Sequence, residues 1–296
     1  MSKQRAGLLG ATSLTGECVI KRLLEYDWHI TAFSRHSITK LTPHPQVTWR
    51  QFDTIGAIKN CNQENEIHFW LCAAPIWVLP EHFDLLSTYN ARRIVVLSST
   101  SRFTKAGSPD PRERRIAQQL IEGEAHLQTW AAAHGVTWII LRPTLIYGYG
   151  RDKNISEIAR FIRRFGFFPL LGPACGLRQP VHVEDVAAAC YAALVAANLP
   201  SRAYNLSGGE TLTYRVMVER VFIAMNRPVR TFTVPLWLFR IATWGLKWLP
   251  GYRNWTTAMA ERMNRDLNFD VSEAKQDLHF RPRPFKLTTS DLPSQS

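Results

Sequence analysis

Several patterns that would fix a function directly are missing from this chain of 296 residues. Its five cysteines form no Cys-x-x-Cys pair and are odd in number, which argues for a reducing compartment and against structural zinc. There is no His-Glu-x-x-His metal motif and no Gly-x-Ser-x-Gly turn of a serine hydrolase. No apolar run reaches the roughly twenty residues that a membrane span needs. We therefore expect a cytoplasmic globular protein without a metal centre.

Acidic residues are also scarce, since 24 Asp and Glu stand against 36 Lys and Arg and give a formal net charge of +12. Such a charge calls for an anionic cofactor, nucleic acid or an anionic membrane surface as partner. The basic residues are spread along the chain, and no helix-turn-helix, zinc-finger or aromatic RNA-binding signature accompanies them. Nucleic acid is therefore not favoured.

The first thirty-five residues have the pattern strand, glycine turn, helix, strand. An apolar run at 6–9 leads into Gly-Ala-Thr-Ser-Leu-Thr-Gly at 10–16, and helical spacing follows over 17–24. In a parallel βαβ unit such a turn presents a helix N-terminus to a diphosphate. Gly10 and Gly16 hold the outer positions of a Gly-x-x-Gly-x-x-Gly fingerprint, but Ser13 replaces the middle glycine and narrows the gap. An ordinary turn without a ligand is the alternative.

Strand-like and helical segments alternate to about residue 147. The expected strands cover 46–52, 66–72, 93–97 and 136–141, and a long helix is expected over 111–133. This order predicts an α/β fold with a doubly wound parallel Rossmann sheet. We expect a dinucleotide-binding domain over 1–150, with strand and helix returns near 178–207, and a smaller substrate-binding lobe mainly over 151–296.

Six blocks in order resemble the extended and atypical short-chain dehydrogenase/reductases, the NAD-dependent epimerase/dehydratase-like group. They are the turn at 10–16, Ser98-Ser99-Thr100, LRPTLIYGYGRDKNI at 141–155, RQPVHVEDVAAA at 178–189, AYNLSGGE at 203–210 and DVSEAKQDLHFRPRPF at 270–285. The resemblance implies the Rossmann fold and an NAD(P)-binding, oxidoreductase or epimerase-like protein.

The resemblance also implies the cofactor contacts. Arg35 falls where the family discriminates between cofactors, and a guanidinium there can clamp a 2′-phosphate, so NADP(H) is favoured over NAD(H). For Arg35, a solvated surface charge is the alternative. Asp53 matches a position at which the family contacts the adenine edge. The remaining implied cofactor residues are Gly10, Thr12, Ser13, Leu14, Gly16, Ala73, Ala74, Ser98, Pro143 and Ile146.

Catalysis departs from the family. Active members resemble one another in a Ser or Thr hydroxyl plus Tyr-x-x-x-Lys, in which the tyrosine transfers the proton. Thr100 fits the hydroxyl position, whereas counting back from Glu124 places Ile116 and Leu120 at the tyrosine and lysine positions. Since no tyrosine occurs between 89 and 147, the usual mechanism is not available.

Three interpretations remain open. The protein is an atypical reductase or isomerase, a redox-inactive NADP(H)-binding sensor or assembly scaffold, or a protein without cofactor. The candidate donors near the nicotinamide are Thr100, His182, Tyr147 and Cys175. Tyr147, His182 and Arg178 are assigned to the substrate side, where Arg178 meets either an anionic substrate group or a surface ion pair. We read Asp185 as the N-cap of a helix over 186–195 and not as a catalytic group.

Two stretches of the C-terminal half are rich in aromatic and basic residues. RFIRRFGFF at 160–168 is explained by the two faces of one amphipathic helix. The proline-bounded segment 234–250 holds three tryptophans and is either a helix over the substrate pocket or a peripheral membrane contact. The small-molecule substrate is not specified by the sequence.

Overall fold

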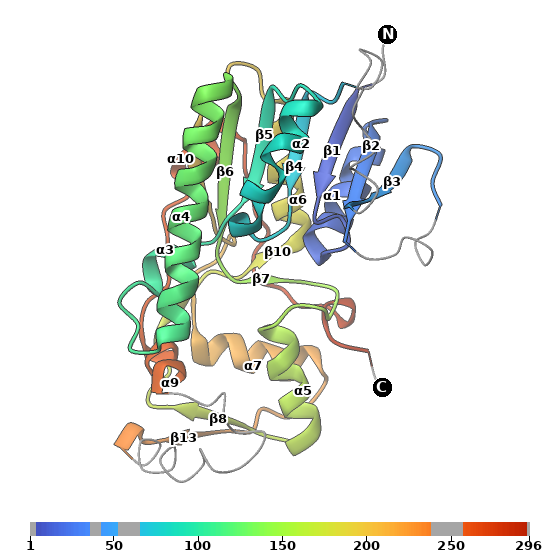
Figure 1. Ribbon diagram of the computed structural model, residues 1–296. Helices are drawn as coiled ribbons and strands as arrows, with labels where there is room; N and C mark the ends of the chain where they lie inside the picture. Colours follow the sequence, from blue (N-terminus) through green and yellow to red (C-terminus); the bar gives the residue numbers. More distant parts are fainter. Residues whose placement is uncertain (1–3, 36–42, 53–65, 238–256, 295–296) are drawn as a thin grey trace.

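The computed structural model describes residues 4–35, 43–52, 66–237 and 257–294. Seven parallel strands form its central sheet in the order β11-β6-β5-β4-β1-β2-β3 (Figure 1). Their bounds are Arg5–Leu9 (β1), His29–Ser34 (β2), Val47–Gln51 (β3), Phe69–Cys72 (β4), Arg93–Leu97 (β5), Thr137–Pro143 (β6) and Arg202–Leu206 (β11). The strand order reverses between β1 and β4, which is the switch point where such sheets bind ligands. The predicted doubly wound parallel sheet is confirmed.

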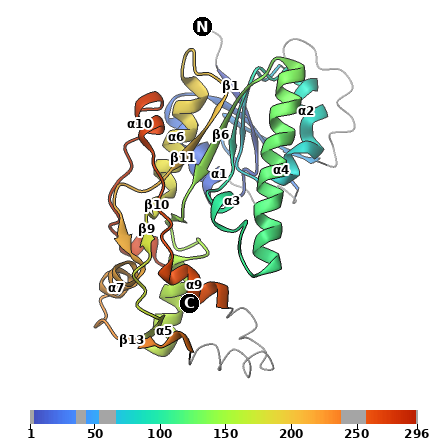
Figure 2. The ribbon, with the colours of Figure 1, turned by 90° about the vertical axis from the view of Figure 1, so that its left-hand side faces the viewer.

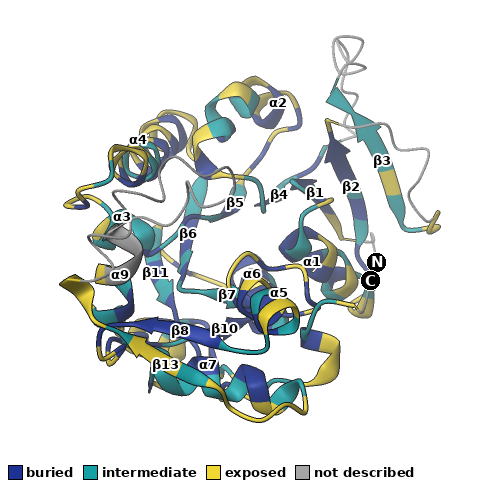
Figure 3. Ribbon diagram, turned by 90° about the horizontal axis from the view of Figure 1, so that it is seen from below, coloured by how far each residue is buried: buried dark blue, intermediate teal, exposed yellow. Residues whose placement is uncertain are grey.

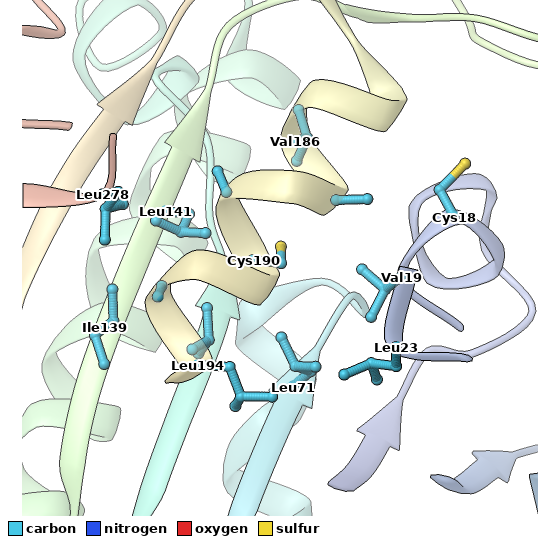
Figure 4. Close-up of a cluster of buried hydrophobic side chains, with 14 of the residues drawn as sticks. Cys18, Val19, Leu23, Leu71, Ile139, Leu141, Val186, Cys190, Leu194 and Leu278 are labelled. Atoms are coloured by element: carbon cyan, nitrogen blue, oxygen red, sulfur yellow. The ribbon is translucent and has the colours of Figure 1, made fainter. Parts of the chain in front are cut away.

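Helices cover both faces of the sheet (Figure 2). On one face α1 (Leu14–Glu25) packs against α6 (Val183–Val195), and their small and branched side chains form a buried cluster with the strands (Figure 4). On the other face α4 (Pro111–His134) lies over η3 (Ile76–His82) and α2 (Phe83–Thr88). The two apolar layers fix the sheet between the helices, so its carboxyl edge is a rigid platform.

Local signals explain where the two helices nearest the site begin. The Ser13 side chain accepts a hydrogen bond from the Gly16 N–H at the start of α1, and Asp110 does the same for Arg112 N at the start of α4. Both are N-cap contacts that satisfy otherwise unpaired amides. The long helix α4 ends at Gly135, whose φ of 65° is favourable for glycine.

The C-terminal lobe lies at the lower end of Figure 1. Its larger elements are α5 (Ile155–Phe165), β8 (Phe168–Leu171), α7 (Tyr214–Ala224), β13 (Thr231–Val234) and α9 (Thr257–Asn264). Shorter elements join it to the sheet: α3 (Ser101–Thr104), β7 (Ile146–Tyr147), β9 (Leu177–Arg178), β10 (Val181–His182), β12 (Leu212–Thr213), α10 (Ser272–Asp277) and η4 (Thr289–Asp291). A separate buried cluster stabilises this lobe.

Two sequence predictions about helices in the second half of the chain are wrong. The helix expected over 160–168 ends at Phe165, because Gly166 takes φ 77° and Phe168 begins β8. The helix α6 starts at Val183 with His182 as its N-cap, so Asp185 lies inside the first turn. Of the segment 234–250, only residues up to Trp237 are described. No helix among the described residues is long and apolar enough to cross a membrane.

Candidate functional site

The glycine turn after β1 is shaped by two close backbone approaches. Gly10 has φ 74°, and a Cβ there would lie 2.7 Å from the carbonyl carbon of Ala73 and closer still to Ala74 N. A Cβ on Gly16 would overlap the Gly10 carbonyl oxygen. Both positions therefore require glycine for steric reasons. The turn brings Gly10 to Ala73 and Ala74, and the resemblance assigns all three residues to the cofactor.

Ser13 is turned back into this loop. Its Oγ donates to Gly10 O at 2.8 Å and accepts from Gly16 N at 3.0 Å. The side chain thus satisfies the helix end and does not project from it. The Gly16 N–H donates to Ser13 Oγ, and the Glu17 N–H donates to Ser13 O. In the described structure the N–H groups of Leu14 and Thr15 have no hydrogen-bond partner. Two adjacent amides at a helix N-terminus are the groups that bind a diphosphate.

Arg35 follows the last residue of β2 and is exposed. Its charge acts on His82 at the end of η3. Burial lowers the pKa of His82, the Glu81 charge opposes this shift, and the Arg35 charge adds to it. His82 in turn stacks on Phe52 with ring centroids 4.5 Å apart. Arg35 therefore lies on the β2 side of the switch point with a second basic side chain nearby. The predicted adenine contact Asp53 lies outside the described residues.

A buried charge cluster occupies the other side, at the ends of β5 and β6. Ser98 Oγ donates to Glu124 Oε1 at 2.5 Å, and Arg142 binds the same carboxylate through Nε at 3.0 Å and Nη2 at 2.5 Å. Arg102 from α3 forms an ion pair with Glu124 as well. The Glu124 side chain is only 2% exposed. Ser98, predicted as a cofactor residue, is thus held by a carboxylate that two guanidinium groups neutralise.

Thr100 lies beside this cluster. Both its N–H and its Oγ1 donate to Pro143 O at 3.2 Å, which connects the end of β5 to the end of β6. Ile146, two residues beyond Thr144, pairs with Val181 in the short β7–β10 sheet. The predicted hydroxyl and the two predicted apolar positions Pro143 and Ile146 therefore lie along one connected edge.

The face of α4 that continues this edge is apolar. Leu120 is buried in the cluster formed with η3, β4 and β5, and Ile116 packs against the same cluster. These are the positions that the resemblance assigns to the tyrosine and lysine. The sequence of α4 contains neither residue type. Positions 116 and 120 of α4 therefore carry apolar side chains and neither a tyrosine nor a lysine.

Tyr147 and His182 contact each other below the sheet edge. Their rings meet edge to face at 5.1 Å, and Tyr147 is fully buried with no hydrogen-bond partner for its hydroxyl among the described residues. Burial raises the pKa of Tyr147, and the Asp291 and Asp185 charges add to this. The phenol therefore stays protonated at neutral pH. A buried hydroxyl without a partner is uncommon and marks Tyr147 for a bound group or water.

His182 is fully engaged. Its Nδ1 accepts from Glu184 N at 3.2 Å, and its Nε2 donates to Asp291 at 3.1 Å. Burial acts to raise the pKa of Asp291, but hydrogen bonds from His182 and Thr288 outweigh it and lower the pKa to about 2. His182 therefore anchors the C-terminal segment to the end of β10, and Asp291 is a residue that the sequence did not single out.

Arg178 is buried and does not form the surface ion pair that the sequence left open. Its Nη1 donates to Leu177 O at 2.6 Å and Arg265 O at 2.8 Å, and its Nη2 donates to Arg262 O. The last two carbonyls belong to the end of α9. Burial lowers the Arg178 pKa to about 10. Arg178 thus ties α9 to β9.

Other side chains join the two lobes. Arg151, after β7, binds Glu17 in the first turn of α1, with one Nη2–Oε1 distance of 2.9 Å. Arg283 donates to Asp185 through its backbone N and its Nε, both at 2.9 Å. The Asp185 carboxylate therefore binds Arg283 and does not cap the helix. Cys175 lies exposed between β8 and β9 in the C-terminal lobe. The described residues hold no group of three or more His, Cys, Asp and Glu side chains suited to a metal ion.

The arginine partners of Glu124 are not among the residues predicted from the sequence. A charged residue at the end of a buried strand, as in Leu141-Arg142-Pro143, could have signalled Arg142. Arg102 carried no such signal, because it follows the strand in an ordinary short helix. The Glu17–Arg151 pair spans 134 residues and equally has no local sequence pattern.

Comparison with known proteins finds a family model that matches part of the chain. The sequence model of the NAD dependent epimerase/dehydratase family matches residues 82–207. An uncharacterized protein y4nG of Sinorhizobium fredii is 27% identical over 186 residues, which cover 61% of this chain and 44% of that protein. UDP-glucose 4-epimerase of Vibrio cholerae is 21% identical over 161 residues, 54% of this chain and 47% of that protein. The chain thus matches less than half the length of either relative.

The fold also resembles that of solved epimerase structures. The structure of UDP-glucuronic acid 4-epimerase from Bacillus cereus in complex with NAD superposes with a TM-score of 0.69 at 13% identity, over 97% of this chain and 95% of that one. At such identity the likeness shows the fold alone. Residues 82–207 thus match the model of the NAD dependent epimerase/dehydratase family, and the sheet topology of the chain is that of the Rossmann-fold epimerases.

Proposed function

We propose that the chain binds a nicotinamide dinucleotide at the β1–α1 turn, with NADP(H) preferred over NAD(H), and acts in the oxidoreductase or epimerase class. The observation that carries the proposal is the cradle at Gly10, where backbone approaches leave no room for a Cβ. Ser13 supports the proposal, because its hydroxyl bonds to Gly10 and Gly16 within the turn and does not project from the helix end. Such a turn is built for close backbone contact with a pyrophosphate.

The residues fit each part of this cofactor. The amides of Leu14 and Thr15 would hold the diphosphate, and the small Ala73 and Ala74 lie next to Gly10 in the same turn. Arg35 would pair with the 2′-phosphate, since a guanidinium can donate two parallel hydrogen bonds to phosphate oxygens. When bound, the nicotinamide supplies hydride transfer to or from a carbon centre.

Proton transfer has to come from outside α4. Thr100 is the nearest hydroxyl that the family pattern places at the reacting carbon, and its Oγ1 is held on Pro143 O at 3.2 Å. Tyr147 has an unpartnered phenol but lies fully buried against His182 and Phe285. Thr100 is therefore the preferred group for orienting a substrate oxygen. The UDP-sugars named for the B. cereus and V. cholerae proteins make nucleotide sugars the first substrates to test.

A redox-inactive NADP(H)-binding protein is the second candidate. It is favoured by one observation, the apolar packing of Ile116 and Leu120 on the face of α4 that would otherwise carry the acid and its lysine. Such a protein would bind cofactor and not turn it over.

A titration followed by a turnover assay separates the two. Purified protein is titrated calorimetrically with NADPH and NADH, and the nicotinamide absorbance is then followed with nucleotide sugars and small carbonyl compounds. Binding with turnover that falls in Thr100→Val and returns in Thr100→Ser supports the enzyme. Binding without turnover supports the redox-inactive protein, and absence of binding rejects both.

A further inference from the structure

The lower end of the C-terminal lobe, around β8 and β13 in Figure 1, carries exposed aromatic side chains beside arginines, and we call this group the aromatic–arginine face. It is defined by Phe165, Phe167, Phe232 and Trp237 together with Arg164 and Arg230. Phe165 and Phe232 are 42% and 48% exposed, and Trp237 is 64% exposed. Seen from below, the outer strand β13 is partly exposed, whereas β8 beside it is buried (Figure 3). Contiguous exposed apolar groups of this kind mark an interaction site.

The rings form one connected row. Phe165 and Phe167 lie 6.2 Å apart between ring centroids, and Phe167 and Phe232 lie 5.1 Å apart. The turn at Gly166 separates Phe165, the last residue of α5, from Phe167, which directly precedes β8. Trp237 follows three residues after β13. The ring contacts therefore join residues 165–167 to β13, and exposed Trp237 follows on the same segment as β13.

Arginines border this row. The Arg164 guanidinium carbon lies 5.2 Å from the centroid of the Phe165 ring, and exposed Arg230 immediately precedes β13. Neither residues 158–183 nor residues 220–237 contain a single Asp or Glu. These two segments are thus basic and aromatic and contain no acidic residue.

We propose that the aromatic–arginine face binds the surface of a lipid bilayer rich in anionic headgroups. Aromatic side chains prefer the interfacial region of a bilayer, and arginines gain from the negative surface potential. A protein partner would call for mixed charges around the apolar centre, whereas this border is of one sign. The proposal does not depend on cofactor binding, because β8 and β13 lie at the lower end of the C-terminal lobe, whereas the β1–α1 turn lies at the edge of the central sheet (Figure 1).

Vesicle co-sedimentation tests the proposal. The full chain is mixed with vesicles of phosphatidylcholine alone or of phosphatidylcholine with phosphatidylglycerol. We expect binding to the anionic vesicles, at least about tenfold weaker binding for Trp237→Ala, and about 25-fold weaker binding for Arg164→Gln/Arg230→Gln. Added salt should weaken the binding further.

The control variants are matched in chemistry and lie on the Rossmann half. Trp77→Ala removes another partly exposed tryptophan, and Arg92→Gln/Arg115→Gln removes the same charge. They should bind as the unaltered protein does. Absence of vesicle binding, equal binding to both compositions, or equal losses in the controls would overturn the proposal. Self-association in the absence of lipid that Trp237→Ala abolishes would overturn it too, and would assign the face to a second copy of the chain.

Discussion

The two sides of the switch point follow the family pattern to different extents. On the β1–β4 side, Gly10, Gly16 and the alanines after β4 form the tight turn that a pyrophosphate needs. On the β5–β6 side, the hydroxyl of Thr100 is in place, but Ile116 and Leu120 occupy the wall where an acid and a lysine are expected. The side that we propose for the cofactor keeps its glycine turn, and the side that the resemblance assigns to proton transfer carries apolar residues instead.

This difference shows that the two sides are maintained by different physical constraints. The cofactor turn depends on backbone space, which only glycine leaves free. The β5–β6 side depends on a carboxylate, since Glu124 compensates two arginines and holds Ser98. That charge cluster stabilises the edge whether or not a proton is transferred there. The altered side can therefore keep its shape without the usual catalytic pair.

The largest expected effect comes from breaking the charge cluster. Glu124→Gln leaves Arg102 and Arg142 partly buried without a counter-charge, so the free energy of unfolding should fall by about 3–5 kcal/mol. Chemical denaturation measures it. Glu17→Gln is the control, because its ion pair with Arg151 is about half exposed and should contribute at most about 1 kcal/mol. Equal losses in the two variants would show that the cluster has no special role.

Gly10→Ala breaks the cofactor side. The new Cβ would overlap Ala74 N in a backbone of φ 74°, so the turn has to open. We expect NADPH affinity to fall by at least about 100-fold, equivalent to roughly 2.7 kcal/mol. Calorimetric titration measures it. Gly107→Ala is a matched control, since nothing lies within 4 Å of a Cβ at that position. Unchanged NADPH affinity in Gly10→Ala would contradict cofactor binding at the Gly10 turn.

Arg35→Ala sharpens the comparison within the cofactor side. Loss of a charge-assisted hydrogen bond should weaken NADPH binding by about 10- to 100-fold and leave NADH binding unchanged. Parallel titrations with both cofactors measure the ratio. A similar loss for both would mean that Arg35 supports the turn and does not select the phosphate.

The smallest effect concerns the acid stability of the C-terminal anchor. The pKa of Asp291 is lowered to about 2 in the folded chain, so its contribution to stability is fully present above about pH 4 and is lost as the pH falls toward 2. The size of this contribution is roughly 2 kcal/mol. Asp291→Asn should give a flatter stability curve over that range in denaturation measured at several pH values. An unchanged slope would exclude the His182–Asp291 pair as its source.

Much of the fold could be predicted, because hydrophobic runs and glycine spacing are local. The expected strand at 93–97 coincides with β5, and the helix expected over 111–133 with α4 to within one residue. The helix over 160–168 failed because helical spacing continued through Gly166, whose left-handed backbone ends α5. The assignment of Asp185 failed because His182, three residues earlier, caps the helix instead.

The site was less predictable, since its geometry depends on contacts between distant residues. The turn at 10–16 could be found from spacing, but the orientation of Ser13 toward Gly10 could not. Arg102 and Arg142 meet Glu124 across 22 and 18 residues, and no periodicity encodes such a meeting. Sequence patterns thus locate the edge of the sheet that holds the site, while the charge partners emerge only from packing.

Cofactor titration of the unaltered protein tests the central claim most directly. The account predicts calorimetric binding of NADPH with one site per chain and clearly weaker binding of NADH. It rests on a glycine cradle that Ser13 leaves free and on an arginine at the end of β2. Absence of heat with either cofactor on folded protein would contradict the account, because the turn would then be a structural loop in a protein that shares only the family fold.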